Sequence, residues 1–300
     1  MLEDFLTTRL GPGSIFFPPY LLCSGLFALF WLKRVEQYGL KDAFDILVLR
    51  DQSREPSMRV DWLFSLCFVV ALQGPVHEFE NAAFMHTLYA SEHVLSLLGS
   101  APWELRAPVV FEGVLATLLT MLAIDFSSYA MHRALHRFTP LWRVHAVHHA
   151  ATGLTPFTTY RQHPLEPVIL NGARGVAAAV ALACFHWVFV QRTPVVTIYG
   201  LGAGFFAYMF TVNLHHASVP VRYPRWLRYV LISPHVHHLH HSADKQHQNC
   251  NFGVVFAFWD RAFRTYFERD FSAGELRFGL GEDDPFAHSL RASLLHPVFG

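Results

Sequence analysis

Long apolar stretches alternate with polar segments along most of this chain. An α-helix needs roughly 20 apolar residues to cross a bilayer. The pattern therefore predicts an all-α, multi-pass membrane protein, and the last two stretches, separated by three residues, predict a helical hairpin. The five apolar stretches are 14–32, 60–76, 108–129, 167–190 and 194–214.

Basic residues are distributed unevenly between the polar segments. Six lysines and arginines lie in 33–59, whereas Arg106 is the only one in 77–107. Loops rich in Lys and Arg remain on the cytoplasmic side of a membrane. We therefore expect 33–59 in the cytoplasm and 108–129 to run towards it. Within 77–107, the residues 84–99 are expected to form a helix at the membrane interface.

The composition agrees with a lipid-facing surface. Charged residues make up 15% of the chain, whereas a soluble domain carries about 25%. The formal net charge of zero gives no electrostatic case for nucleic acid binding. The four cysteines have no close partners in the sequence, so neither a disulfide framework nor a CxxC zinc site is indicated. We expect N-terminal membrane helices in 1–107, a histidine-bearing domain in 108–268 and a polar tail in 269–300.

Histidine is concentrated between His132 and His247, in the motifs HRALH, HAVHH and HHLHH. Residues three and four apart share one face of a helix, so each motif directs two or three imidazoles towards one point. One zinc ion takes about four ligands, so eight motif histidines predict two metal ions. The eight are His132, His136, His145, His148, His149, His237, His240 and His241.

The predicted topology brings these motifs together. After 108–129 has crossed inward, HRALH and HAVHH emerge in the cytoplasm, and the hairpin crosses out and back. The later histidines then lie on the same face, in a bacterial inner membrane or the endoplasmic reticulum. The segment 221–233 mixes arginines with Trp226 and Tyr229, which is typical of an interfacial helix or of an ordinary amphipathic surface helix.

Metal-bound histidines usually donate their second ring N–H to a carboxylate or a carbonyl. Asp125 lies seven residues before His132, hence on the same helical face, and an ionisable residue near a membrane stretch indicates function. Asp244, Asp260 and Glu166 are alternatives in this supporting role.

These motifs resemble those of the fatty acid hydroxylase/sterol desaturase superfamily of membrane di-metal oxygenases. HRxxH matches 132–136, and the two HxxHH motifs match 145–149 and 237–241. The superfamily's lone histidine after the hairpin matches His216, which becomes a ninth predicted ligand. Its usual asparagine two residues later is Ser218 here, and Asn213 is an alternative contributor. The sequences at 161–166 (RQHPLE), 251–253 (NFG) and 259–266 are also similar to the family. The roles of His163 and His215, as ligands or as neighbours, stay open.

The resemblance implies a non-haem centre of two Fe ions, which zinc can replace in purified protein. It implies O2-dependent hydroxylation or desaturation of a C–H bond in a lipid, such as a sterol or a fatty acyl chain. The chain has no Rossmann, haem or iron–sulfur motif. The implied electron source is therefore a separate cytochrome-b5-type or ferredoxin donor with an NAD(P)H reductase.

Two other classes of protein have histidine-rich sequences. A membrane metal transporter or metal-binding protein is the alternative, but a transporter would carry polar residues across the bilayer midplane, and these apolar stretches hold few. A zinc hydrolase needs a carboxylate base beside its ligands, as in HExxH. None of the motifs contains Asp or Glu.

Overall fold

The computed structural model describes residues 18–47, 55–101, 105–189, 197–198, 201–202, 214–271, 275–281 and 284–299. Apart from loops, turns and isolated bridges, the described residues form helices and one antiparallel pair of two-residue strands, β1 (Thr197–Ile198) and β2 (Leu201–Gly202). The prediction of an all-α protein is confirmed. The helices are α2 (Pro18–Arg34), α3 (Leu40–Leu47), α4 (Pro56–Cys67), α5 (Gln73–Leu97), α6 (Val109–Arg137), α7 (Thr139–His149), α8 (Leu165–Val188), α10 (Arg225–Arg228), α11 (Pro234–His240), α12 (Phe258–Ala262) and α13 (Leu290–Phe299).

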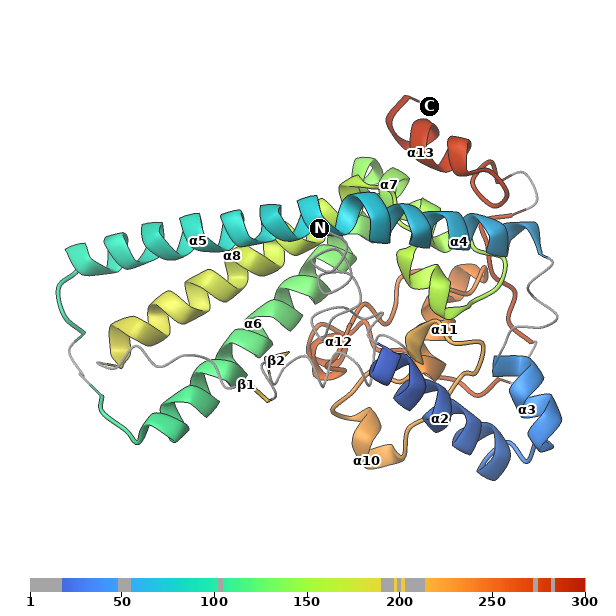
Figure 1. Cartoon of the computed structure of the whole chain (residues 1–300), viewed down its shortest axis with the longest axis horizontal. Coiled ribbons are helices and arrows are strands. Elements are labelled where there is room, and N and C mark those ends of the chain that lie inside the picture. Colours follow the sequence, from blue (N-terminus) through green and yellow to red (C-terminus); the bar gives the residue numbers. More distant parts are fainter. Residues whose placement is uncertain are drawn as a thin grey trace.

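Three long helices, α5, α6 and α8, extend away from the rest of the molecule and form what we call the arm (Figure 1). Helix α8 packs against both α5 and α6. The α5–α8 contact is close because α8 carries glycines where the helices meet. A Cβ atom at Gly175 would lie 2.8 Å from the backbone oxygen of Glu80, closer than real Cβ contacts come.

Helices α4 and α5 form one continuous helix from Pro56 to Leu97, joined by the π-helical segment η2 (Phe68–Leu72). At this junction the N–H of Gln73 bonds to the carbonyl of Phe68. Pro75 has no N–H to continue the regular ladder, and the wider π turn lies just before it. The residues 84–97 are helical, and the helix ends two residues before the predicted boundary at 99. They continue the stretch 60–76 instead of forming a separate helix.

Within the described residues, three helices are long and apolar enough to cross a membrane: Pro56–Leu97, Val109–Arg137 and Leu165–Val188. The stretches 108–129 and 167–190 are thus confirmed as long apolar helices. The described part of 14–32 is α2, which packs against α3 and residues 219–223 and is not one of these three. Most of 194–214 lies outside the described residues, and the predicted hairpin with it.

The remaining helices form what we call the cap, at the end of the arm where α6 finishes and α8 begins (Figure 1). Helix α4 and the chain near Phe286 share a hydrophobic cluster with α7, built around Val60, Phe64 and Val147. Helix α13, in the predicted polar tail, also packs on α7. Segments that precede and follow the histidine motifs in the sequence therefore pack on α7.

Candidate metal centre

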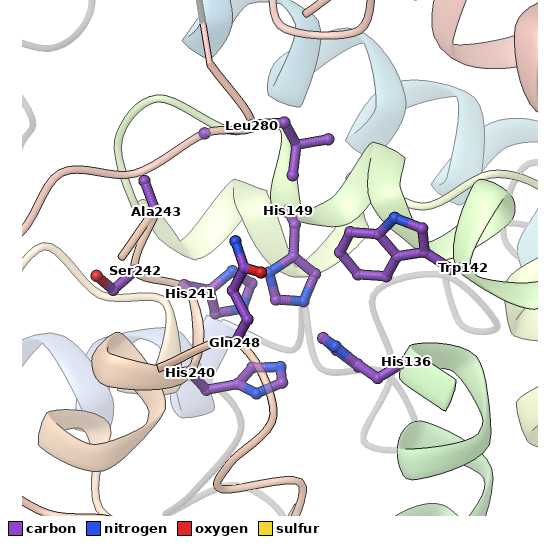
Figure 2. Close-up of a pocket in the computed structure, with 10 residues that line it drawn as sticks. His136, Trp142, His149, His240, His241, Ser242, Ala243, Gln248 and Leu280 are labelled. Carbon is purple, nitrogen blue, oxygen red and sulfur yellow. The ribbon is translucent and has the colours of Figure 1, made fainter. Parts of the chain in front are cut away.

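The motif histidines lie on three helices that end in the cap. Helix α6 continues eight residues beyond its apolar stretch and carries His132 and His136 in its last turns. Helix α7 starts with proline at its second position and ends at His149. Helix α11 likewise starts at Pro234, and proline fits the first turn of a helix because its missing N–H is not needed there. Figure 2 shows His136, His149, His240 and His241 pointing towards a common region.

The nine predicted ligands form two adjacent groups. In the first cluster, one ring nitrogen from each of five histidines lies within 4.8 Å of the other four. In the second cluster, the same distance joins ring nitrogens of His148, His216 and His241. His237 completes the second cluster, because its Nε2 lies 3.0 Å from that of His216 and 3.1 Å from that of His241. The first cluster is His132, His136, His145, His149 and His240; the second is His148, His216, His237 and His241.

Hydrogen bonds at Nδ1 fix how three of these rings are protonated. The Nδ1 atoms of His132, His148 and His240 lie 2.9, 3.2 and 2.7 Å from the carbonyl oxygens of Phe252, Arg161 and Cys250. A carbonyl oxygen only accepts, so each Nδ1 carries the hydrogen. In a neutral ring the Nε2 atom then presents a bare lone pair. These lone pairs face into the clusters.

The clusters contain buried nitrogen atoms that the described protein atoms do not satisfy. The Nε2 atoms of His132, His136 and His240 are buried without a hydrogen-bond partner. The Nε2 of His216 lies 3.0–3.2 Å from three other imidazole nitrogens, yet one ring nitrogen carries at most one hydrogen. Buried polar atoms without partners are costly. A metal ion in each cluster would bind these lone pairs, so the residues fit two ions.

Burial keeps the imidazoles in the form that binds metals. Desolvation, strengthened by the neighbouring histidines, lowers the pKa of His148 to about 3. The pKa values of His149, His216, His237, His240 and His241 are also well below the ordinary value, for the same reason. These rings are neutral at pH 7, and a neutral imidazole is a metal ligand.

Carboxylates support the clusters in two different ways. Glu166 Oε1 accepts a hydrogen bond of 2.9 Å from His145 Nδ1, directly behind the first cluster. Asp125 and Asp260 make no hydrogen bond to a clustered histidine among the described residues. Asp260 accepts from the backbone N–H groups of Phe252 and Gly253, and Asp125 accepts from those of residues 255 and 256. They hold the loop whose carbonyls orient His132 and His240.

The other candidate residues lie outside the clusters. Asp244 is exposed and accepts from Gln246 at the start of the 3₁₀ segment η4 (Lys245–His247). His163 Nε2 lies 3.1 Å from the Leu294 carbonyl. His215 stacks on His237 with ring centroids 4.5 Å apart, which places it behind a clustered ring. Asn213 lies outside the described residues.

Comparison with known proteins places this arrangement in a family. The sequence profile named fatty acid hydroxylase matches residues 117–265, which contain both clusters. The chain belongs to the fatty acid hydroxylase/sterol desaturase superfamily. No solved structure matches the chain.

Curated relatives within this superfamily are lipid-modifying enzymes by name. The chain is 27% identical to an ornithine lipid hydroxylase of Rhizobium tropici, over 55% of this chain and 44% of the relative. It is 26% identical to an alkylglycerol monooxygenase of Caenorhabditis elegans, over 62% of this chain and 31% of the relative. A Delta(7)-sterol 5(6)-desaturase of Gibberella zeae is 27% identical over 73% and 67%. The first two alignments thus span less than half of each relative.

Sequence reasoning on the superfamily motifs missed several supporting groups. Thr159 Oγ1 lies 3.0 Å from His216 Nδ1, and the carbonyls of Cys250, Phe252 and Arg161 orient three further rings. Every residue has a carbonyl, so no side-chain pattern marks these acceptors. Thr159 follows HAVHH by ten residues, and only the folded loop brings it to His216.

The first cluster borders a small pocket in the cap. Trp142, Gln248 and Leu280 line this pocket together with His136, His149 and His240 (Figure 2). Gln248 is exposed and Leu280 is 40% exposed, so the pocket mouth is accessible. The histidines at the edge of the first cluster are therefore the ones nearest to this opening.

Proposed function

We propose that this protein is a membrane non-haem di-iron oxygenase that hydroxylates or desaturates a C–H bond of a lipid. The observation that carries the proposal is the pair of adjacent, buried clusters of neutral imidazoles with unsatisfied nitrogen atoms. Imidazole suits iron. The family match and the lipid-modifying relatives support iron and a lipid in this role.

The two clusters would each hold one iron ion, with His132, His136, His145, His149 and His240 around one and His148, His216, His237 and His241 around the other. When bound, the iron pair would supply the activation of O2 and the oxidation of the C–H bond. The chain orients the ligands. Glu166 holds His145 in position, and Asp260 holds the loop that orients His132 and His240. Burial of the rings excludes bulk water from the site.

The position of the clusters favours a substrate drawn from the bilayer. They lie where the arm meets the cap, and the arm exposes large apolar side chains such as Phe111, Leu118 and Val180. A lipid tail in the bilayer would reach the histidines along this surface. We propose a sterol, a fatty acyl chain or a related lipid; the relatives are named for an ornithine lipid, an alkylglycerol and a sterol.

Electrons and location complete the proposal. A separate cytochrome-b5-type or ferredoxin donor, reduced by an NAD(P)H reductase, would supply the electrons, in keeping with the lack of a donor motif in the chain. The basic segment 33–59 supports placing the cap on the cytoplasmic face.

Elemental analysis of detergent-purified protein tests the metal centre first. About two irons per chain are expected after iron-supplemented growth, because nine histidines exceed the roughly four ligands of one ion. Zinc that is displaced by iron in such growth would also agree. If protein grown with or without added iron held no metal tightly, this would contradict the oxygenase and favour the alternative of a metal transporter.

A further inference from the structure

The cap contains a buried ion pair outside the histidine clusters. Arg161 is fully buried, and its Nη1 donates to Asp61 Oδ1 at 2.8 Å. Asp61 lies on α4, 56 residues before the region that matches the family profile. A buried charge is retained only when it is paired and hydrogen-bonded, so the environment of Arg161 is built around this contact.

The remaining donors of Arg161 bind three separate parts of the chain. Its Nε donates to the carbonyl of Val147 in α7. Its Nη1 also donates to Ser57 in α4, and its Nη2 donates to the carbonyls of Phe286 and Ala287. One side chain therefore joins α4, α7 and the segment before α13.

The short segment that contains Arg161 also orients two rings of the second cluster. The 3₁₀ segment η3 (Pro156–Tyr160) leads directly into Arg161. Thr159 is hydrogen-bonded to His216 Nδ1, and the carbonyl of Arg161 accepts from His148 Nδ1. Thr158, beside Thr159, donates to Asp61 Oδ2 at 2.7 Å. Asp61 thus holds this segment twice, through Thr158 and through Arg161.

The first cluster has different supports. Its rings bond to Glu166 and to the carbonyls of Cys250 and Phe252, all of which belong to the family-matched region. Among the described residues, none of these three groups is hydrogen-bonded to Asp61. A disturbance at Asp61 therefore reaches His148 and His216 before it reaches the first cluster.

We infer that Asp61 is a positioning residue for the second metal ion, acting through Thr158 and Arg161 on His216 and His148. This inference rests on the proposed di-metal site. The carboxylate of Asp61 holds the segment 156–161 in the position from which it orients the rings of His148 and His216 towards His237 and His241. Its loss lets the segment shift and weakens the second site more than the first.

Two near-isosteric variants of the full-length protein test this. Asp61→Asn removes the charge that pairs with Arg161, and Thr158→Val removes the hydroxyl that binds Asp61. We expect the iron content to fall from about two to about one per folded chain. Electron paramagnetic resonance should then show a mononuclear ferric signal instead of a coupled pair. Raising the iron concentration should restore the second ion, because all nine ligands are still present.

Thr117→Val is the matched control, because Thr117 is a buried threonine of α6 whose hydroxyl donates to Gly113 within its own helix. It should retain two irons and the coupled signal. The inference requires that the wild type holds two irons. It would be overturned if either test variant kept both ions with wild-type affinity, or if the variant lost both ions in parallel. A wild type that binds no metal would instead overturn the proposed function and this inference together.

Discussion

The arm and the cap are stabilised by opposite kinds of contact. The arm consists of apolar helices whose most apolar segments are only 28–33% buried, with the helix Pro56–Leu97, which includes α5, and α6 at 28% and α8 at 33%. The cap buries charged and polar side chains such as Arg161, Asp260 and His240 and gives them specific partners. The arm thus requires an apolar environment around it, whereas the cap requires particular residues within it. The effect of a substitution in the cap should therefore depend on which residue is replaced. In the arm it should depend mainly on whether the apolar character of the helix is kept.

The largest effect is expected from the clustered histidines. His240→Ala removes a ligand from the first cluster, and His148→Ala removes one from the second. Both variants should reduce the bound iron and abolish lipid oxidation, because the missing nitrogen has no substitute in the buried site. Metal content and turnover with O2 and a reduced donor are the measurements.

His163→Ala is the control for these variants, because His163 is hydrogen-bonded to Leu294 and lies outside both clusters. It should retain iron. Full iron loading and full turnover in either cluster variant would contradict the two-ion site and remove the distinction between cap and arm.

Cysteine labelling tests whether the arm crosses a membrane. Single cysteines at exposed positions in the cap, Arg137→Cys and Ala243→Cys, should react with an impermeant reagent from the cytosolic side. Ser100→Cys, at the far end of the arm, should react from the opposite side, because α5 and α6 are each long enough to span. Wild-type Cys23, Cys67 and Cys184 are exposed and are replaced by serine beforehand. Labelling of all three positions from one side would show that the arm does not span.

Hydropathy predicted the arm well, because a helix in an apolar environment is specified by composition and length. The stretch 108–129 corresponds to α6, and the helix continues to Arg137 because the histidines of HRALH extend the same register. The break expected between 60–76 and 84–99 is absent, because the π turn before Pro75 keeps the helix continuous. The local sequence around Pro75 does not predict that a π turn will keep the helix continuous.

The cap was predictable only where side chains carry the chemistry. Motif spacing and the family resemblance predicted nine histidine ligands. The structure brings their side chains together in two clusters, and their binding of metal stays a prediction. The carbonyls of Cys250 and Phe252 and the contact between Asp61 and Thr158 depend on loops that meet only in the folded chain. Asp125 was expected to support His132 directly, and the structure places it under the loop at residues 255–256. The seven-residue spacing between Asp125 and His132 indicates a helical face, but it does not indicate which groups the carboxylate binds.

The smallest expected effect is on the stability of the arm. It tests whether close packing between α5 and α8 matters in addition to their apolar composition. Gly175→Ala places a methyl group 2.8 Å from the backbone oxygen of Glu80, which cannot move without shifting α5. Overpacking costs about 1–3 kcal/mol, and the better helix propensity of alanine returns about 1 kcal/mol. Gly172→Ala is the matched control, because its methyl group meets the ring of Phe79, a side chain that can rotate away. Thermal unfolding in detergent should show a lower midpoint for Gly175→Ala alone. Equal midpoints would mean that α5 and α8 slide freely past each other and that composition, without close packing, suffices for the arm.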